Sequence, residues 1–334
     1  MSKVNRVSTT LTMPRRIAFS NIVLRSSRLI VFLVLFIAMA IASPAFFTMR
    51  NLLNILGQSI PIFLLVAGET LVMATGGVDL SLGVTGALSA SFVAASLRHG
   101  NPIWLSIILG LAVGSFFGVI NGLIVAKIRI NPFITTFGTR LLILSLLNWY
   151  MRSSAIYDLP EPFRFLGIGR IGGIPAIIFV GLFIFAILYF LLNYTTFGRA
   201  LYAIGSNSLA SRISGIKVER ILITVYAIAG IMSSAALMLI IARVNAADTR
   251  LYEGHELNAI LGALLGGATF AGAVGTINGA VIGTLIFVLM RNAINLLGVS
   301  PLWSTFVSGI VVFLVVLMDE GVRRRVVIRR SSKH

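Results

Sequence analysis

Asp79 is the ionisable residue of this sequence whose surroundings are the least expected. It lies in the stretch TGGVDLSLG at residues 75–83, between the apolar stretches IPIFLLVAGETLVMA and VTGALSASFVAASL. In one interpretation, two glycines end a helix and the Asp79 carboxylate caps the next helix by accepting bonds from the amides of Ser81 or Leu82. In the other, the stretch interrupts a membrane span and forms part of an inner gate, which requires burial in protein. The residues concerned are Gly76, Gly77, Asp79 and Ser81.

Other ionisable side chains also fall in apolar stretches. Glu69, Arg140 and Arg291 lie within them, and Glu256 lies at an edge. Charged groups are costly inside a bilayer, so these side chains are expected to face the protein interior or a cavity. An ion pair between Glu69 and Arg140 is one arrangement that we consider, although no sequence spacing supports it.

The sequence carries no motif for catalysis or for a bound metal. No lysine follows a glycine, so the phosphate-binding motif G-x-x-x-x-G-K-[ST] is absent, as are H-E-x-x-H and G-x-S-x-G. There are no cysteines, and His99, His255 and His334 are widely spaced. We therefore predict that the chain is not an enzyme and binds no cofactor or metal, so that any work driven by ATP comes from a partner.

The composition indicates an all-α integral membrane protein. Of the 334 residues, 57% are hydrophobic and 11% are charged, whereas a soluble domain has about 25% charged residues. A membrane span needs about 20 apolar residues, and on this basis we predict ten spans; the eighth is short and glycine-rich, so nine is the alternative. They lie near 30–47, 54–75, 79–97, 103–126, 132–151, 173–193, 220–243, 257–273, 277–298 and 303–319.

The formal net charge of +17 reflects membrane topology and does not indicate nucleic-acid binding. Lysine and arginine are concentrated in a basic N-tail at 1–29, in a loop at 194–219 and in a basic C-tail at 320–334. Positively charged loops favour the cytoplasm, so both termini are predicted to be cytoplasmic and to flank a transmembrane domain at 30–319. The number of spans is then even, and the basic tails would contact anionic lipid of the inner leaflet.

The predicted cytoplasmic loop after the sixth span is too long for a plain connection. A start signal at Thr196 predicts a short helix that ends at Gly205. Ser206 or Asn207 would cap a second short helix, which would end at Gly215. Such a pair of helices could dock a soluble partner or lie on the membrane surface, and periodicity alone does not decide between these alternatives.

A short internal repeat suggests two related halves. AVGSFFGVING at 112–122 and AVGTING at 273–279 fall in the fourth and ninth spans. These spans are five apart and run in opposite directions, as in an inverted repeat that matches spans 2–5 with spans 7–10. However, both strings lie toward the cytoplasmic side, where inverted copies should lie at opposite depths. In the alternative interpretation, Asn121 and Asn278 only bond helix to helix.

Several segments resemble those of the ABC permeases for ribose, xylose and related monosaccharides. TGGVDLSLG is similar to the family's glycine-glycine-aliphatic-Asp-Leu-Ser signature, and NPFITTFGT at 131–139 is similar to its Pro-Phe-Ile-x-Thr-x-Gly-Thr segment. TTFGRALYAIGSNSLASRISGIKV at 195–218 resembles its coupling loop. YEGHELNAILGALLGGATFAGAVGTINGAVIGTL at 252–285 and NLLGVSPLW at 295–303 resemble later segments. The resemblance runs from about the second predicted span to the last.

This resemblance implies a type II importer-like bundle of about ten helices in the bacterial cytoplasmic (inner) membrane. Two permease copies, or one copy and a sister permease, would pair in the lipid bilayer. A cytoplasmic ABC ATPase would use ATP and Mg, and an extracytoplasmic sugar-binding protein would deliver the solute. The ATPase coupling residues would be Phe197, Gly198, Arg199, Ala200, Ala203, Gly205, Ala210 and Gly215.

The chain departs from the family at two positions. Many relatives carry an acidic residue where this chain has Asn258, and most have an uncharged residue where Arg140 stands. Either departure could adjust the pathway or only the packing. Both bear on the identity of the solute more than on the fold.

These observations together predict the permease subunit of an ATP-driven importer of a monosaccharide or sugar-like solute. Hydroxyl-rich solutes need hydrogen-bond donors and acceptors, so the candidates for the translocation pathway are Asn121, Asn258, Asn292 and Asn295. Helix packing is the alternative role of each. The rival function is an autonomous secondary transporter or channel for a small polar solute. A pentose, a hexose, a furanose signal molecule and a polyol all fit, and the sequence leaves open whether the permease pairs with itself or with a sister chain.

Overall fold

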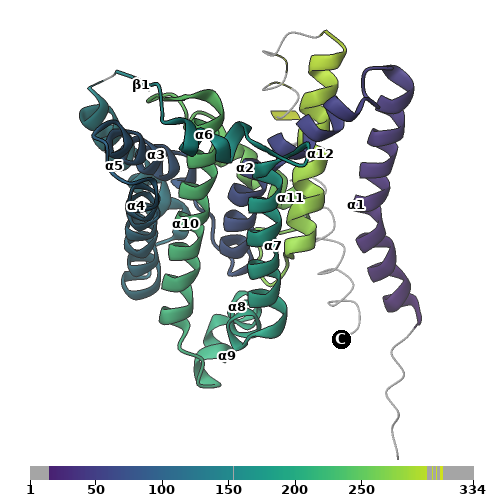
Figure 1. The fold of residues 1–334 in the computed structure, drawn as a ribbon. Helices are drawn as coiled ribbons and strands as arrows, with labels where there is room; N and C mark the ends of the chain where they lie inside the picture. The colour runs from purple at the N-terminus through teal and green to yellow at the C-terminus, as the bar shows by residue number, and fades with distance from the viewer. Residues whose placement is uncertain (1–14, 153, 299–302, 304–305, 307–308, 311–334) are drawn as a thin grey trace, which may run out of the picture.

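The chain is mainly helical. Its structure, a computed structural model, describes residues 15–152, 154–298, 303, 306, 309 and 310. In this part of the chain it has twelve α-helices, one π-helical turn and four strands of two residues each. Figure 1 shows the longer helices running between two ends of the molecule. The helical class predicted from composition is therefore confirmed.

Within the described ranges, five helices are long and apolar enough to cross a membrane. They are α2 (Met49–Ala74), α4 (Ile103–Leu123) with its π-helical continuation η1 (Ile124–Ile128), α7 (Ala176–Tyr194), α10 (Val218–Val244) and α12 (Ile277–Leu296). Three more helices occupy predicted spans, namely α1 (Arg15–Ala42), α3 (Leu82–Arg98) and α5 (Pro132–Met151). Of these, α3 and residues Arg28–Ala42 of α1 are shorter apolar helices.

Two predicted spans differ in extent from the helices of the structure. The third, predicted near 79–97, corresponds to α3, which begins at Leu82 after non-helical residues and a turn. The eighth was predicted over 257–273, but α11 (His255–Leu265) has only 11 residues and is followed by irregular chain. A helix of that length is too short to cross the hydrocarbon core.

The structure describes the two ends of the chain to different extents. Helix α1 begins at Arg15, inside the predicted basic N-tail, and continues without a break into the first predicted span. The tenth predicted span lies outside the described residues, apart from four helical positions between 303 and 310. The basic C-tail also lies outside them.

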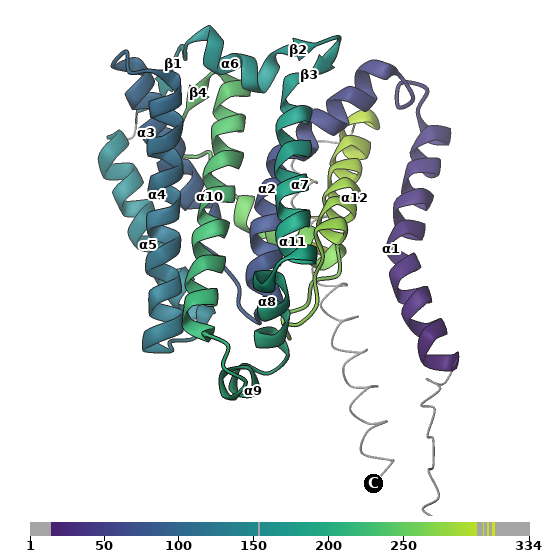
Figure 2. The same cartoon turned by 60° about the horizontal axis from the view of Figure 1, so that its bottom comes forward.

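Short elements mark the two ends of the bundle, as Figure 2 shows. At one end, β1 (Ile156–Tyr157) pairs antiparallel with β4 (Ala246–Ala247), with Ile156 opposite Ala247. The hairpin of β2 (Arg170–Ile171) and β3 (Ile174–Pro175) and the helix α6 (Glu161–Ile168) lie at the same end. The opposite end carries α8 (Thr196–Ser206) and α9 (Ser208–Ile213). We call these the β1 end and the α8 end.

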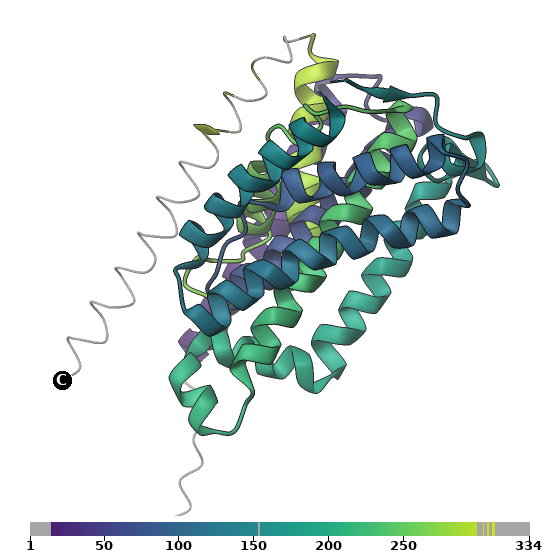
Figure 3. The same cartoon turned by 90° about the vertical axis from the view of Figure 1, so that its left-hand side faces the viewer.

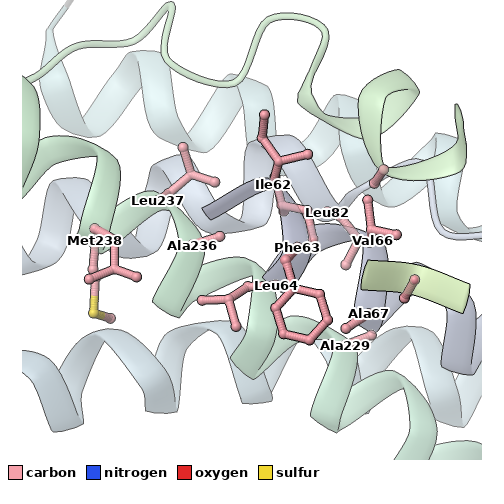
Figure 4. Packing of buried hydrophobic residues seen from close by; sticks show 14 of the residues in the cluster. Ile62, Phe63, Leu64, Val66, Ala67, Leu82, Ala229, Ala236, Leu237 and Met238 are labelled. Carbon is pink, nitrogen blue, oxygen red and sulfur yellow. The ribbon is translucent and has the colours of Figure 1, made fainter. Parts of the chain in front are cut away.

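The core forms around α2 and α10, which are the two most enclosed of the long helices. Figure 4 shows apolar side chains of both helices packed together, with Leu82 of α3 among them. Gly68 lets α2 approach α10 closely, since a Cβ there would lie 3.2 Å from the Cα of Ala229. Phe63, Leu64 and Val66 of α2 are almost completely buried. This core packs against Leu82 and so fixes the start of α3.

Helix α4 packs on the other side of α10 through a row of glycines spaced four residues apart. A Cβ at Gly118 would lie 2.9 Å from the Cα of Ala227, and one at Gly122 would lie 2.7 Å from the Cα of Ile223. Close backbone contact through small residues is a common way to associate helices in a membrane. Figure 3 views the molecule from the side of α3, α4 and α5, which pack against one another.

Helix α1 stands at the edge of the bundle (Figure 1) and packs against α12. Arg28 of α1 reaches back into the bundle and donates to the carbonyl of Gly266 at 2.7 Å. Gly266 is the C-cap of α11, where a positive charge interacts favourably with the helix dipole. The first helix is thereby attached to the end of the shortened eighth span.

Candidate functional site

The stretch between α2 and α3 is non-helical chain that turns back into the protein. Helix α2 ends at Ala74, and Gly76 makes the turn with a φ of +85°, a conformation that favours glycine. Four residues of the stretch that follows are buried, namely Gly77, Val78, Asp79 and Ser81. Non-helical backbone is tolerated at membrane depth only where protein covers it, and this stretch meets that condition.

Side chains of neighbouring helices provide partners for this extended backbone. The amide of Asp79 lies 3.3 Å from each carboxyl oxygen of Glu69 on α2. The amide of Leu80 donates to Oγ1 of Thr136 on α5 at 3.2 Å. The Thr136 hydroxyl in turn lies 3.2 Å from the carbonyl oxygen of Val78 and 2.9 Å from that of Pro132. These contacts replace bonds that a continuous helix would have made internally.

The Asp79 carboxylate binds the residue at the start of α3. Its Oδ1 accepts from the Ser81 amide at 2.8 Å and from the Ser81 hydroxyl at 2.6 Å. Ser81 is the N-cap of α3, and its Oγ accepts from Nδ2 of Asn121 on α4 at 2.9 Å. The bond from the Ser81 amide is the one expected of a cap, but Asp79 stands two residues before the N-cap. The carboxylate therefore ties the extended stretch to α3 and, through Ser81, to α4.

A second interruption lies between β4 and α11. Residues 248–254 lead from the β1 end into the protein, and Gly254, at a φ of +76°, precedes the first turn of α11. The buried Glu256 carboxylate of that turn lies against Gly83 of α3, where a Cβ would also be 2.9 Å from the carbonyl oxygen of Tyr252. The N-termini of α3 and α11 thus meet inside the protein, and the two helices run from there toward opposite ends.

Glu256 forms an ion pair across this meeting point. Nη2 and Nε of Arg140 on α5 lie 2.9 Å and 3.2 Å from its Oε1. The guanidinium also stands 5.7 Å from the centre of the Tyr252 ring. The suggested pairing of Arg140 with Glu69 is therefore wrong. The short α11 places Glu256 at the depth of Arg140, whereas Glu69 faces the Asp79 amide.

The α8 end has the two short helices predicted from the sequence. Thr195 caps α8 by accepting from the amide of Gly198 at 3.4 Å. Asn207 caps α9 by accepting from the amide of Ala210 at 2.9 Å. Gly215 follows in the left-handed region, at a φ of +85°. The predicted pair of helices is confirmed, with Asn207 as the cap of the second.

Helix α8 contacts the chain at the start of the first interruption and in the loop that follows α11. Gly205 packs against the backbone of Ala74, where α2 ends, and a Cβ there would be 2.5 Å from the amide nitrogen of Ala273. That amide donates to the Ala74 carbonyl at 2.9 Å. The Tyr202 hydroxyl donates to the carbonyl of Gly275 at 2.6 Å, and burial raises its pKa so that it keeps its proton. One short helix thus touches the start of the extended stretch and the loop after α11.

The predicted coupling residues divide into packing residues and surface residues. Gly198 packs against the backbone of Leu192, and Gly205 packs as described above. A groove of about 600 Å³ is lined by Thr196, Phe197, Arg199, Ala200, Ala203, Gly215, Ile216, Lys217 and Ile221. Two residues on α9 that were not predicted as part of this surface, Leu209 and Ile213, are 67% and 80% exposed. Their spacing of four residues on a polar helix was the signal that could have revealed this apolar surface.

The four asparagines proposed for a pathway do not come together in one site. Asn121 is buried beside Ser81, and Asn258 is half-buried in the first turn of α11. Asn292 exchanges hydrogen bonds of 2.9 Å and 3.3 Å with Asn51 of α2. Asn295 is exposed in the last turn of α12. Only the first two lie near the starts of the interrupted helices.

Comparison with known proteins identifies the family. The profile described as "Branched-chain amino acid transport system / permease component" matches residues 51–316. The chain belongs to this permease family. It is 37% identical to the ribose import permease protein of Escherichia coli (strain K12) over 299 residues, which cover 87% of this chain and 92% of that protein. It is 38% identical to the ribose import permease protein of Bacillus subtilis (strain 168) over 310 residues, 92% of this chain and 96% of the other.

A second kind of import permease is also similar. The galactose/methyl galactoside import permease protein of Escherichia coli (strain K12) is 32% identical over 310 residues, which cover 87% of this chain and 92% of that protein. No solved structure matches the chain. The predicted resemblance to the monosaccharide permeases is therefore confirmed by near-full-length similarity.

Membership of this permease family establishes the class of function. The chain is the permease component of an ABC-type importer and not an enzyme, as predicted. Permeases of this type bind no cofactor, work with a separate ABC ATPase that uses ATP, and depend on a periplasmic binding protein. The chain is a multi-pass membrane protein, homologous to bacterial inner-membrane permeases.

We predict that Thr136→Val destabilises the permease by about 1–3 kcal/mol, because the buried groups of Val78 and Leu80 lose their partner. Thr139→Val is the matched control, since the Thr139 hydroxyl is also buried but bonds only the Thr135 carbonyl of its own helix. Thermal unfolding of the detergent-solubilised chain measures both. Equal midpoints for the two variants would show that Thr136 does not hold the extended stretch.

Proposed function

We propose that this permease carries a monosaccharide or a sugar-like solute, which an extracytoplasmic binding protein delivers. The observation that carries the proposal is the similarity to ribose and galactose import permeases over about nine tenths of both chains. A pentose, a hexose, a furanose signal molecule and a polyol all fit this class.

The proposed topology has ten spans and both termini in the cytoplasm of the cell. Basic residues gather toward the α8 end, including Lys127 and Arg129 after α4 and Lys217 before α10. The N-terminus of α1, which begins in a basic segment, lies at the same end (Figure 1). This distribution supports a cytoplasmic α8 end and an extracytoplasmic β1 end. The tenth span of this topology is the one predicted from the sequence at 303–319, most of which lies outside the described residues.

The interrupted helices support an inverted repeat in a type II importer-like bundle. Helices α3 and α11 are the third and eighth spans, five apart, and they are entered from the α8 end and the β1 end respectively. Interruptions at opposite ends are what inverted copies require, whereas the strings AVGSFFGVING and AVGTING both lie toward the α8 end. In transporters built in this way, the N-termini of half-helices point at the solute site. The gate would accordingly lie where α3 and α11 meet.

In this mechanism the coupling loop transmits motion from the ATPase to the gate. Leu209, Ile213 and the groove beside Arg199 present an apolar and basic surface at the α8 end. Gly205 and Tyr202 of α8 contact Ala74 and Gly275, at the start of the stretch between α2 and α3 and in the loop after α11. A displacement of α8 would therefore move the Gly76–Ser81 stretch and the loop after α11 together. A second permease, either a copy or a sister chain, would complete the pathway.

We predict that uptake into proteoliposomes of the radiolabelled sugar that the cognate binding protein binds requires ATP, the ATPase and the binding protein, and that Ile213→Asp abolishes it by weakening ATPase binding. Ile171→Asp is the matched control, because Ile171 is also an exposed isoleucine but lies at the β1 end. Co-purification of the ATPase with each variant locates the defect. Uptake driven by an ion gradient without the ATPase would contradict the proposal.

The Arg140–Glu256 pair is proposed to hold α11 against α5 while the gate is closed. Removing one partner of a fully buried pair lowers the free energy of unfolding by about 3–5 kcal/mol. We expect a smaller loss for this pair, because the Arg140 side chain is 24% exposed. We predict that Arg140→Glu and Glu256→Arg each impair ATP-driven uptake and that the double variant regains part of it. If the double variant were no better than the worse single variant, the pair would not act as a contact between these helices.

A further inference from the structure

Two carboxyl groups lie next to each other in the protein interior without a positive partner. The side chains of Glu69 and Asp79 are 0% and 1% exposed, and both Glu69 oxygens are within 3.3 Å of the Asp79 amide. In the described part of the chain, neither carboxyl forms a salt bridge. The ion pair of Arg140 with Glu256, one turn along α5 from Thr136, is already neutral. Two unbalanced negative charges at this depth would cost several kcal/mol each.

The surroundings favour the charged form of Asp79 but not that of Glu69. The Asp79 carboxylate accepts two short bonds from Ser81, at 2.8 Å and 2.6 Å. It also stands just before the N-terminus of α3, where the helix dipole stabilises a negative charge. The Glu69 carboxyl receives only the Asp79 amide, at the long distance of 3.3 Å to each oxygen. Adjacent carboxyl groups in such unequal surroundings divide into one acid and one carboxylate.

An unpartnered oxygen beside the pair points to a missing hydrogen-bond donor. Asn121 is 1% exposed, and its Nδ2 is bound to Ser81, but its Oδ1 has no partner among the described residues. An amide oxygen can only accept a hydrogen bond. Leaving such a buried group unpaired carries a cost that a proton on a neighbouring carboxyl would reduce.

We propose that Glu69 and Asp79 form an acid–carboxylate pair that binds one proton, held on Glu69 at neutral pH. The groups that face the pair from α4, α5 and α10 are Asn121, Thr136 and Tyr226, none of which is charged at neutral pH. A metal cation is the other source of positive charge. Gly77 packs closely against Val72, Pro132 and Tyr226, which leaves little room for a metal cation and favours a proton.

The bound proton makes the stability of the gate region depend on pH in a defined direction. A group that holds its proton more tightly in the folded chain than in the unfolded chain stabilises the fold at low pH, and this contribution is lost as pH rises. Loss of the proton would leave two carboxylates side by side and push the Gly76–Ser81 stretch away from α2. Glu69→Gln keeps the size of the protonated side chain and cannot ionise.

The test is thermal unfolding of the full chain in nanodiscs between about pH 6 and pH 9, a range around neutrality in which ordinary carboxyl groups do not titrate. We expect the wild-type midpoint to fall toward the alkaline side, and Glu69→Gln to keep the neutral midpoint without that fall. Glu253→Gln is the control, because Glu253 is exposed and lies in the loop before α11; it should keep the wild-type profile. An equal alkaline fall in wild type and Glu69→Gln would overturn the proposal.

Infrared spectroscopy of the same samples tests the proton directly and does not depend on the stability of a variant. We expect a protonated-carboxyl C=O band in the wild-type chain at neutral pH, and its loss in Glu69→Gln. Absence of the band from the wild type would overturn the proposal. The proposal would also be overturned if added Na⁺ raised the unfolding midpoint of the wild type, but not of Glu69→Gln, at constant pH. A metal cation would then supply the positive charge beside the two carboxyl groups. Neither measurement uses transport, so a failure here is distinct from a failure of the proposed function.

Discussion

The architecture depends on keeping non-helical backbone bonded and covered inside a membrane. A bilayer offers no water to unpaired amides and carbonyls, so each break in a helix must find partners within the protein. Here the Thr136 hydroxyl and the Glu69 carboxyl form hydrogen bonds with the backbone of the stretch between α2 and α3. Asp79 then joins that stretch to α3. The enclosed helices α2 and α10 supply the surrounding protein, and the glycine row of α4 brings a third helix close enough to contribute Asn121.

This constraint also explains why the charged residues of the interior lie where they do. The N-termini of α3 and α11 meet at Gly83 and Glu256, and two helix dipoles there present their positive ends. Asp79 and Glu256 are the carboxylates beside those ends, and Arg140 balances the second of them. Helix α8 touches Ala74 at the start of the first break and the loop that follows α11. A movement received at the surface of α8 would thus act directly on the first break, and on the second through α11.

Much of this arrangement could be predicted from single residues, but the contacts that assemble it could not. The caps and glycines of the loop around Asn207 and Gly215 specify local conformation, so the two short helices were predicted correctly. Runs of about 20 apolar residues also located the long spans. They did not predict the shortness of α11, because a short apolar helix and the irregular chain after it are together as apolar as a full span. The partner of Arg140 was missed because Glu256 is 116 residues away, and no local pattern encodes that contact.

The distance between the starts of α3 and α11 tests the central claim most directly. The natural chain has no cysteine, so Leu80→Cys and Leu257→Cys provide two unique sites for spin labels beside the meeting point. The labelled permease would be measured in lipid with its ATPase and binding protein, with and without ATP. The account predicts two distance populations whose proportions change with ATP. A single distance that is the same in both conditions would contradict it, because the interrupted helices would then be a static feature of the fold.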